Sequence, residues 1–305
     1  MMEEQERQSG GERFFDDSLI SRLDALSMNF GSAVNNLYSG GRRSKMLGST
    51  VEFANFREYI QGDDFRRIDW NAYGRFEKFF IKLFLDEKQL QTNIFVDLSA
   101  SMDFGEPKKY YTAMRIAAAV AYISASATDR VNVTGLADGR SEDIAEGIGG
   151  KDAFFASLGR LAGAKPGGKT DLAASLRKCR ALRGSSGASV LISDLMSDAD
   201  FREPLKYLLY MKQQTVLVHL LSPEEADPPI DGMGRLRLID SENGTYADID
   251  AGPEALKLYA KALEDYTASV RDFCLKAGIY YIPARSDSDI IGLFTGAGAK
   301  AGVFS

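Results

Sequence analysis

A carboxylate and two hydroxyls occupy alternate positions in the run Asp97-x-Ser99-x-Ser101. All three side chains are hard oxygen donors, the ligand type that Mg²⁺ or Mn²⁺ prefers in proteins. The run comes directly after the apolar residues 94–96, which are typical of a strand buried on both faces. In open α/β sheets ligands bind where such strands end. We therefore expect these oxygens to face a binding crevice.

Two later segments supply further oxygen donors. Thr170 comes just ahead of an expected helix, and Asp194 follows the apolar strand expected over residues 188–193. If the strands that lead to Asp97 and Asp194 are neighbours, all these oxygens meet at one crevice. The sequence therefore predicts one divalent-metal site, made of Asp97, Ser99, Ser101, Thr170 and Asp194. The competing interpretation is purely structural, with the serines and aspartates only capping helices and turns.

The order of these residues, Asp-x-Ser-x-Ser followed by a Thr and then an Asp, resembles the metal-ion-dependent adhesion site (MIDAS) of von Willebrand factor A domains. The resemblance covers about residues 92–289. It implies that the hydroxyls coordinate the ion, that the aspartates bind it directly or through water, and that a partner protein's carboxylate fills the open position. It also implies a non-enzymatic interaction module, and we find no nucleophile or cofactor motif that would indicate catalysis.

A second motif overlaps this site. Residues 163–170, GAKPGGKT, match the phosphate-binding pattern G-x-x-x-x-G-K-[ST], and Asp194 could then hold magnesium as in P-loop proteins. A P-loop has to follow a strand, whereas the apolar residues from Phe154 to Leu161 have helical spacing. Nucleotide binding through Gly163–Thr170 is therefore the alternative, and the metal-dependent adhesion site is the leading hypothesis.

A third segment, residues 57–75, is dense in acids, arginines and aromatic residues and begins REYIQGDDFRRIDW. It resembles the signature of the bacterial family catalogued as domain of unknown function fifty-eight, although many members of that family carry N-terminal membrane helices. The resemblance implies a MoxR-type AAA+ ATPase as partner, in maturation or chaperone-like remodelling. Gly74 departs from the family pattern, which more often has Ala. The matching residues are Arg57, Tyr59, Gly62, Asp63, Asp64, Arg66, Asp69, Trp70 and Arg75.

From the residues alone, three roles are open for this signature segment. Its arginines can pair with the neighbouring acids and form a structural latch between an N-terminal arm and the main domain. The same residues can instead form a docking surface for a partner. A second carboxylate metal site is the third interpretation, and the adjacent arginines argue against it because they would neutralise the acids.

The composition narrows the class of protein. The 305 residues carry a formal net charge of −6, so we do not expect nucleic acid as a ligand. Cys179 and Cys274 form neither a disulfide framework nor a zinc site, and His219, the only histidine, lies in an apolar run typical of a core strand. The N-terminus lacks an apolar signal, and the apolar stretch 116–128 is too short to span a bilayer. We expect a cytoplasmic protein with no membrane span.

Strand and helix patterns alternate from residue 92 onward, which predicts a doubly wound, mostly parallel α/β sheet of the von Willebrand factor A or Rossmann type. We also expect a hairpin around Glu242 and a long helix that ends at Gly278. The expected divisions are a disordered start and helical or extended arm over 1–45, the signature segment packing on the main domain over 46–91, the von Willebrand factor A-like domain over 92–295, and a tail over 296–305.

Overall fold

The computed structural model describes residues 14–28, 52–60, 65, 68–76, 78–85, 91–127, 129–183, 187–230 and 234–304. The chain divides into two compact units. Met1–Val34 and Leu90–Ser305 form the larger unit, which holds the predicted metal ligands, and Asn35–Gln89 form the smaller unit, which holds the signature segment. The predicted packing of residues 46–91 on the main domain stays a prediction.

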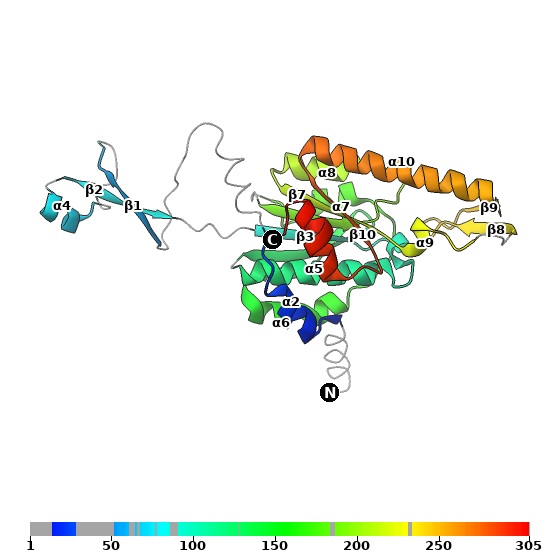
Figure 1. Ribbon diagram of the computed structural model, residues 1–305, viewed down its shortest axis with the longest axis horizontal. Helices are drawn as coiled ribbons and strands as arrows, with labels where there is room; N and C mark the ends of the chain where they lie inside the picture. The colour runs from blue at the N-terminus through cyan, green and yellow to red at the C-terminus, as the bar shows by residue number, and fades with distance from the viewer. Residues whose placement is uncertain are drawn as a thin grey trace. The chain divides into compact units, whose positions relative to one another are not determined.

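A six-stranded sheet forms the centre of the larger unit (Figure 1). Neighbouring strands are parallel except at one edge, where β5 pairs antiparallel with β4. The mostly parallel α/β sheet predicted from the sequence is thereby confirmed. In spatial order the strands are β10 (Tyr280–Arg285), β7 (Gln214–Leu221), β6 (Ala188–Ser193), β3 (Gln91–Asp97), β4 (Arg130–Ala137) and β5 (Arg140–Ile148).

The strand order reverses between β3 and β6. After β3 the chain adds β4 on one side, whereas β6, β7 and β10 follow one another on the other side. Such a reversal is a topological switch point, and the crevice outside the carboxyl ends of the two strands there is the usual ligand site of an open α/β sheet. Asp97 ends β3 and Asp194 directly follows β6, so both residues flank the switch point.

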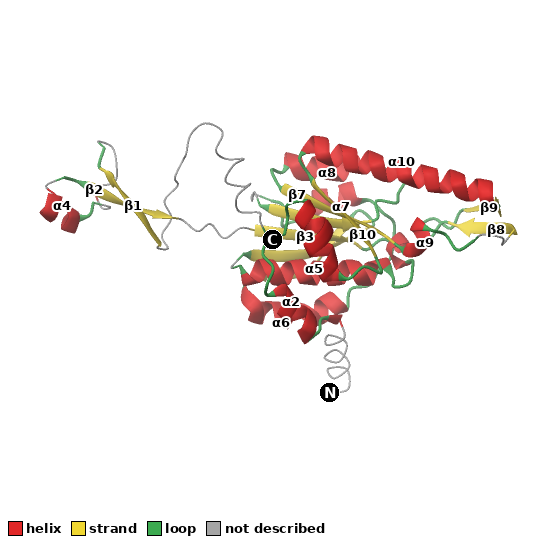
Figure 2. Ribbon diagram, viewed as in Figure 1, coloured by secondary structure: helices red, strands yellow, loops and turns green. Residues whose placement is uncertain are grey.

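Helices cover both faces of the sheet (Figure 2). The residues of β3 show the division, because Ile94 and Val96 belong to one apolar core and Phe95 to another. Burial on both faces explains the apolar runs 94–96 in β3 and 190–192 in β6. The first face carries α5 (Lys109–Ser126) and α6 (Gly150–Ala162), and the second carries α7 (Leu172–Lys178), α8 (Arg202–Tyr210) and α10 (Pro253–Ala277).

Helix α5 is buried along most of its length because it is rich in alanine. Small side chains let its backbone approach the sheet closely, and the helix packs between β3 and α6. One charged residue, Lys109 in the first turn, is fully buried with the alanines. None of the helices in the described part of the chain, α5 included, is both long and apolar enough to cross a bilayer.

Segments from both ends of the larger unit close the α5 face. The helices α2 (Asp17–Leu23) and α11 (Ile290–Leu293) pack on each other and on α5, and the π-helical turn Phe294–Gly298 continues α11. Phe304 stacks on Phe294 with ring centroids 4.3 Å apart. Residues 296–305 are therefore not the tail expected from the sequence, because Phe304 and its neighbour Val303 are buried in the core.

An antiparallel hairpin of β8 (Gly234–Ile239) and β9 (Tyr246–Ala251) leads into α10, and Figure 1 shows it beside the start of that helix. The register pairs Gly234 with Ala251, so the hairpin leaves and rejoins the body at one place. Most side chains of both strands are exposed. The predicted hairpin around Glu242 is confirmed, and so is the left-handed Gly278 that ends α10, with φ 71°.

The smaller unit contains two antiparallel strands and a helix. Strand β1 (Glu52–Glu58) pairs with β2 (Phe80–Leu85), and the register shifts between Phe53 and Asn55. Helix α4 (Trp70–Phe76) precedes β2 in the chain. The signature segment therefore runs from the end of β1 to α4.

Candidate functional site

Asp97 lies at the carboxyl end of β3 with its side chain fully buried. The register pairs Val96 with Ile192 of β6, which sets Asp97 next to Ser193. The Ser193 hydroxyl donates to Asp97 Oδ2 at 2.6 Å, and the Ser99 N–H donates to Oδ1 at 3.0 Å. The Asp97 carboxylate is thus held in one orientation at the switch point.

The hydroxyls of Ser99 and Ser101 face each other, with their oxygens 3.0 Å apart. Ser99 is buried and precedes the short 3₁₀ helix η2 (Ala100–Asp103), but its hydroxyl makes no capping hydrogen bond there. An N-cap serine ordinarily accepts from a backbone N–H of the first turn. This geometry argues against the purely structural interpretation, and it leaves acceptor capacity on both serine oxygens for another ligand.

The loop before Thr170 is tied to the loop after β3. Gly167 donates its N–H to the Leu98 carbonyl at 2.7 Å, and Ala100 donates its N–H to the Gly168 carbonyl at 2.9 Å. These two hydrogen bonds bring the segment that carries Thr170 to the serine loop.

Gly168 is required at its position in this loop. Its φ is +84°, and a Cβ there would lie 2.4 Å from a carboxylate oxygen of Asp138. That same carboxylate accepts the N–H of Lys169 at 2.7 Å. Glycine is the residue that tolerates both the left-handed backbone and the close approach.

The Thr170 hydroxyl does not cap the helix that follows it. Asp171 caps α7 instead, because its side chain accepts the Ala174 N–H at 3.0 Å. Thr170 directs both of its donors to Glu242, which lies between β8 and β9. Its hydroxyl oxygen therefore also keeps acceptor capacity. No sequence signal pointed to Glu242 as a neighbour of this site.

Asp194 is fully buried, and its carboxylate contacts a buried lysine. Lys109 Nζ donates to Asp194 Oδ2 at 2.5 Å and also to Glu225 of the short helix α9 (Pro223–Ala226). The Met196 N–H donates to the other oxygen, Oδ1, at 2.9 Å. Sequence reasoning missed Lys109, and the only signal was a lysine in the first turn of an otherwise apolar helix.

Burial controls the charge balance of this cluster. Burial, and then the charge of Asp194, raise the pKa of Asp97 to about 6. Burial alone would lower the pKa of Lys109, but the carboxylates of Asp194 and Glu225 outweigh it and raise that pKa. Burial raises the pKa of Glu225 despite the nearby ammonium. Lys109 contacts two of the three carboxylates, Asp194 and Glu225, and with all four groups ionised the cluster carries a net charge of −2.

His219 is buried in β7, and burial holds its pKa below the ordinary value. Its Nε2 lies 3.0 Å from the Asp194 carbonyl oxygen, and its Nδ1 lies 3.0 Å from the Tyr281 hydroxyl. A carbonyl only accepts, so Nε2 carries the proton. The Tyr266 ring of α10 lies edge-on to His219, and its hydroxyl donates to the carbonyl of the next residue, Leu195, at 2.7 Å. His219 is therefore a core residue that supports the Asp194 backbone.

The described residues contain no cluster of three His, Cys, Asp or Glu side chains that could hold a metal ion. The predicted site differs in kind, because three of its five donors are hydroxyls. Asp97 and the β6 tip are in contact, the two serines are in contact, and the Thr170 loop is tied to the serine loop. Two carboxylates and neutral hydroxyls are a donor set that fits Mg²⁺ or Mn²⁺. Metal binding itself stays a prediction.

Residues 163–170, the alternative phosphate loop, follow α6 and not a strand. Gly163 is the C-terminal cap residue of α6, and its N–H donates to the Gly159 carbonyl at 3.2 Å. A P-loop links the end of a strand to a helix. The run therefore lacks the structural context that nucleotide binding requires.

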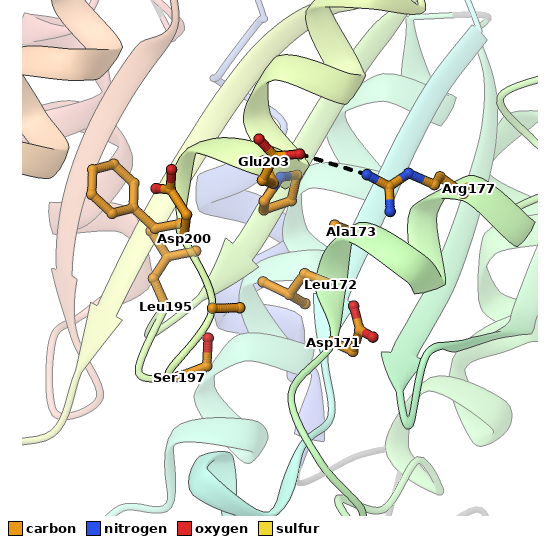
Figure 3. A pocket seen from close by; sticks show the side chains of 11 residues that line it. Asp171, Leu172, Ala173, Arg177, Leu195, Ser197, Asp200 and Glu203 are labelled. Atoms are coloured by element: carbon orange, nitrogen blue, oxygen red, sulfur yellow. Dashed lines mark ion pairs between the residues drawn. The ribbon is translucent and has the colours of Figure 1, made fainter.

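A cleft of about 180 Å³ opens between α7 and the segment that leads into α8 (Figure 3). Leu172 and Leu195 line it together with the polar Ser197. Arg177 and Glu203, also on its wall, form an ion pair at 3.6 Å. The walls of the cleft therefore combine apolar, polar and charged side chains.

In the smaller unit, Asp69 and Trp70 begin α4. Asp69 is buried, and its Oδ1 accepts the Ala72 N–H at 3.2 Å, which caps the helix. Trp70 is exposed and makes edge contacts with Tyr73 and Phe79, whose rings stack 4.6 Å apart. Asp69 thus has a structural role, and Trp70 belongs to an aromatic cluster.

The other signature residues are distributed around this helix. Tyr59 donates its N–H to the Phe79 carbonyl at 2.8 Å, Arg57 lies in β1, and Arg75 is exposed near the end of α4. Glu58 pairs with Lys78 at 2.7 Å. The pairing of the segment's arginines with its acids, which the latch hypothesis expects, stays a prediction. Gly62, Asp63, Asp64 and Arg66 lie outside the described residues.

The chain matches one known protein family over most of its length. The family described as "Protein of unknown function DUF58" matches residues 55–268, which is more than half of the chain. The chain belongs to the DUF58 family. The matched range of this DUF58 protein begins in β1 and ends in α10, so it contains the capped start of α4 and all five predicted ligands.

Relatives of this DUF58 protein include proteins of Mycobacterium bovis and Mycobacterium tuberculosis that are described as uncharacterized. Each is 24% identical over 279 residues, which cover 90% of this chain and 87% of the relative.

Two solved structures show a distant likeness. BatB from Bacteroides thetaiotaomicron matches with a TM-score of 0.40 at 14% identity, over 70% of this chain and 96% of that one. An aerotolerance-related membrane protein from Bacteroides fragilis matches with a TM-score of 0.38 at 15% identity, over 70% and 98%.

Proposed function

We propose that this DUF58 protein is a non-enzymatic interaction module that uses one divalent ion, Mg²⁺ or Mn²⁺, to bind an acidic side chain of a partner protein. In this proposal the fold is of the von Willebrand factor A type and the site is a MIDAS. The family resemblance suggests a MoxR-type AAA+ ATPase as the partner, in chaperone-like maturation or assembly. The ligands of the ion are Asp97, Ser99, Ser101, Thr170 and Asp194.

One observation carries the proposal. The tips of β3 and β6 lie side by side at the switch point, and Asp97 and Asp194 are buried there next to a Ser99 hydroxyl that caps nothing. Buried carboxylates ordinarily need a counter-charge, because removing a charge from water is costly. Lys109 supplies only part of it, and a divalent ion would balance the two remaining negative charges.

The donor set also determines what such an ion would bind. Three of the five proposed ligands are neutral hydroxyls and only two are carboxylates, so a six-coordinate ion would keep one position for a further oxygen ligand, such as a carboxylate. Binding fits the site better than catalysis, because the buried groups nearby that could move a proton already make hydrogen bonds within the protein, and Asp97 accepts one on each carboxylate oxygen. Lys109 is paired with Asp194 and Glu225, and His219 has both ring nitrogens in contact.

Calorimetry with Mg²⁺ and Mn²⁺ tests the metal site. Asp97→Asn should abolish the binding heat of the wild type, because it removes a charged ligand and keeps the size of the side chain. Asp103→Asn is the matched control, since Asp103 lies on η2 nearby and pairs with Lys108 at the surface. Ser101→Ala should weaken binding without disturbing the core, because Ser101 is only half-buried. Equal heats for all four proteins would overturn the proposal.

Co-purification tests the partner. The tagged protein should retain a MoxR-type AAA+ ATPase in Mg²⁺ and release it in EDTA, and Asp97→Asn should fail to retain it while Asp103→Asn succeeds. Capture that survives both EDTA and Asp97→Asn would contradict a metal-bridged contact and would direct attention to the signature segment.

A further inference from the structure

The carboxylate of Glu242 reaches the Thr170 corner of the predicted metal site. The Thr170 N–H donates to Glu242 Oε2 at 3.0 Å, and the Thr170 hydroxyl donates to Oε1. Glu242 is half-buried there and lies in the turn between β8 and β9. A carboxylate from outside the sheet is thus already present at a residue that we assign to metal binding.

The turn that carries Glu242 is built to hold its shape. The Asp240 carboxylate accepts the N–H of Glu242 at 2.7 Å and both the N–H and the side-chain amide of Asn243, at 3.2 and 2.8 Å. Gly244, with φ +71°, donates its N–H back to the Asp240 carbonyl at 2.9 Å. Glu242 therefore has a fixed place on the tip of the hairpin.

The strands behind this tip are exposed. Leu238, Ile239 and Tyr246 are each at least half exposed, and Arg237 pairs with Asp248 across the two strands at 2.7 Å. The hairpin is thus held together largely by its own contacts and buries little apolar surface. Breaking the contact between Glu242 and Thr170 would free the tip without opening a core.

We infer that Glu242 is a built-in carboxylate ligand of this site and occupies the place that an acidic residue of the partner would take. The inference rests on the proposed function. A partner then has to present a carboxylate and displace the hairpin tip, so the tip acts as a competitor inside the chain. When an internal competitor closes the site in most molecules, the apparent affinity for an outside ligand falls by the fraction of molecules that remain open.

The test uses Mn²⁺ as the metal and acetate as the carboxylate. Water-proton relaxation reports how many waters remain on bound Mn²⁺. Glu242→Ala should add about one coordinated water, because it removes one ligand oxygen from the ion. Acetate should bind the Mn²⁺-loaded variant about tenfold more tightly than the wild type if Glu242 closes about nine-tenths of the molecules. Asp250→Ala is the matched control, since it removes a carboxylate from an exposed position of the same hairpin.

The outcomes separate the two proposals. Mn²⁺ that binds wild type and Glu242→Ala with equal relaxation and equal acetate affinity would overturn the internal ligand and leave the metal site standing. Mn²⁺ that binds neither protein would overturn both. Glu242→Gln, which keeps the size of the side chain and removes its charge, should also bind acetate more tightly than the wild type. A variant on an exposed turn should keep the fold, and circular dichroism of each protein checks this.

Discussion

Two kinds of carboxylate meet at one edge of the sheet, and they are held in opposite ways. Asp97 and Asp194 are fully buried, and each of their four oxygens accepts a hydrogen bond. Glu242 reaches the same edge from an exposed hairpin through its contact with Thr170. In our proposal the fold immobilises Asp97 and Asp194, which hold the ion. Glu242, which competes with a partner, can be displaced. Four experiments test this contrast, from the largest expected effect to the smallest.

Lys109→Met should have the largest effect, because it leaves Asp194 and Glu225 buried without their counter-charge. Breaking a buried ion pair by removing one partner costs about 3–5 kcal/mol, and urea unfolding in EDTA measures the loss. Lys108→Met is the matched control: this adjacent lysine is exposed and pairs with Asp103 at the surface, so its removal should leave the midpoint nearly unchanged. Equal midpoints for both variants would show that the buried ion pairs of Lys109 do not stabilise the fold.

Gly168→Ala tests the loop that brings Thr170 to the serines. A Cβ in the left-handed conformation costs about 1–2 kcal/mol, and this one also meets the Asp138 carboxylate. Both the free energy of unfolding and the Mn²⁺ affinity should fall. Gly167→Ala is the control, since it has open space around its Cβ and should change stability by less than about 0.5 kcal/mol. Unchanged Mn²⁺ affinity in Gly168→Ala would separate Thr170 from the metal site.

A pH series tests the burial of Asp97 in the metal-free protein. Its pKa is about 6 in the folded chain against an ordinary 3.8, so the folded state binds the proton more tightly. Stability from this group therefore rises as the pH falls from 7.5 to 5.5, by about 1 kcal/mol. His219, whose pKa is lowered, acts in the opposite direction, so the quantity to measure is the difference between wild type and Asp97→Asn. In EDTA that difference should change with pH, and a constant difference would contradict a buried, titrating Asp97.

Removing the hairpin should have the smallest effect on the body of the protein. Gly234 and Ala251 are paired, so two glycines can replace residues 235–250 without moving either end. The thermal midpoint should shift by no more than a few degrees, because few apolar side chains lose burial. A large drop of the thermal midpoint in scanning fluorimetry would show that the hairpin is needed for the fold. The contrast between the two kinds of carboxylate would then not hold.

The sequence predicted most of the sheet, because β6 and β7 are largely apolar and β3 contains the apolar run 94–96, while the segments between strands have helical spacing or are rich in alanine. The strands that lead to Asp97 and Asp194 and the left-handed Gly278 were recognisable from local residues. Their location at strand ends, where ligands bind in open α/β sheets, followed from the sequence, whereas the adjacency of β3 and β6 was a condition that only the structure supplied. The elements of the smaller unit were not recognised, because the acids, arginines and aromatics of residues 46–91 do not follow one period.

The long-range partners of the site were beyond sequence reasoning. Lys109 meets Asp194 from 85 residues away, and Glu242 meets Thr170 from 72 residues away. A lysine in the first turn of a helix and a glutamate in a turn are ordinary surface residues by type. Only the packing of α5 on the sheet, and the direction in which the hairpin points, give them another role.

Helix α10 connects the exposed β8–β9 hairpin with the buried carboxylates at the end of the sheet. Its 25 residues, about 37 Å of rigid rod at 1.5 Å per residue, begin where β9 ends, and Tyr266 in its second half holds the backbone just after Asp194. A force on the β8–β9 hairpin would therefore be transmitted through α10 to the Tyr266–Leu195 hydrogen bond, which steadies the end of β6. A partner that pulls on the hairpin would thus act mechanically on the predicted metal site.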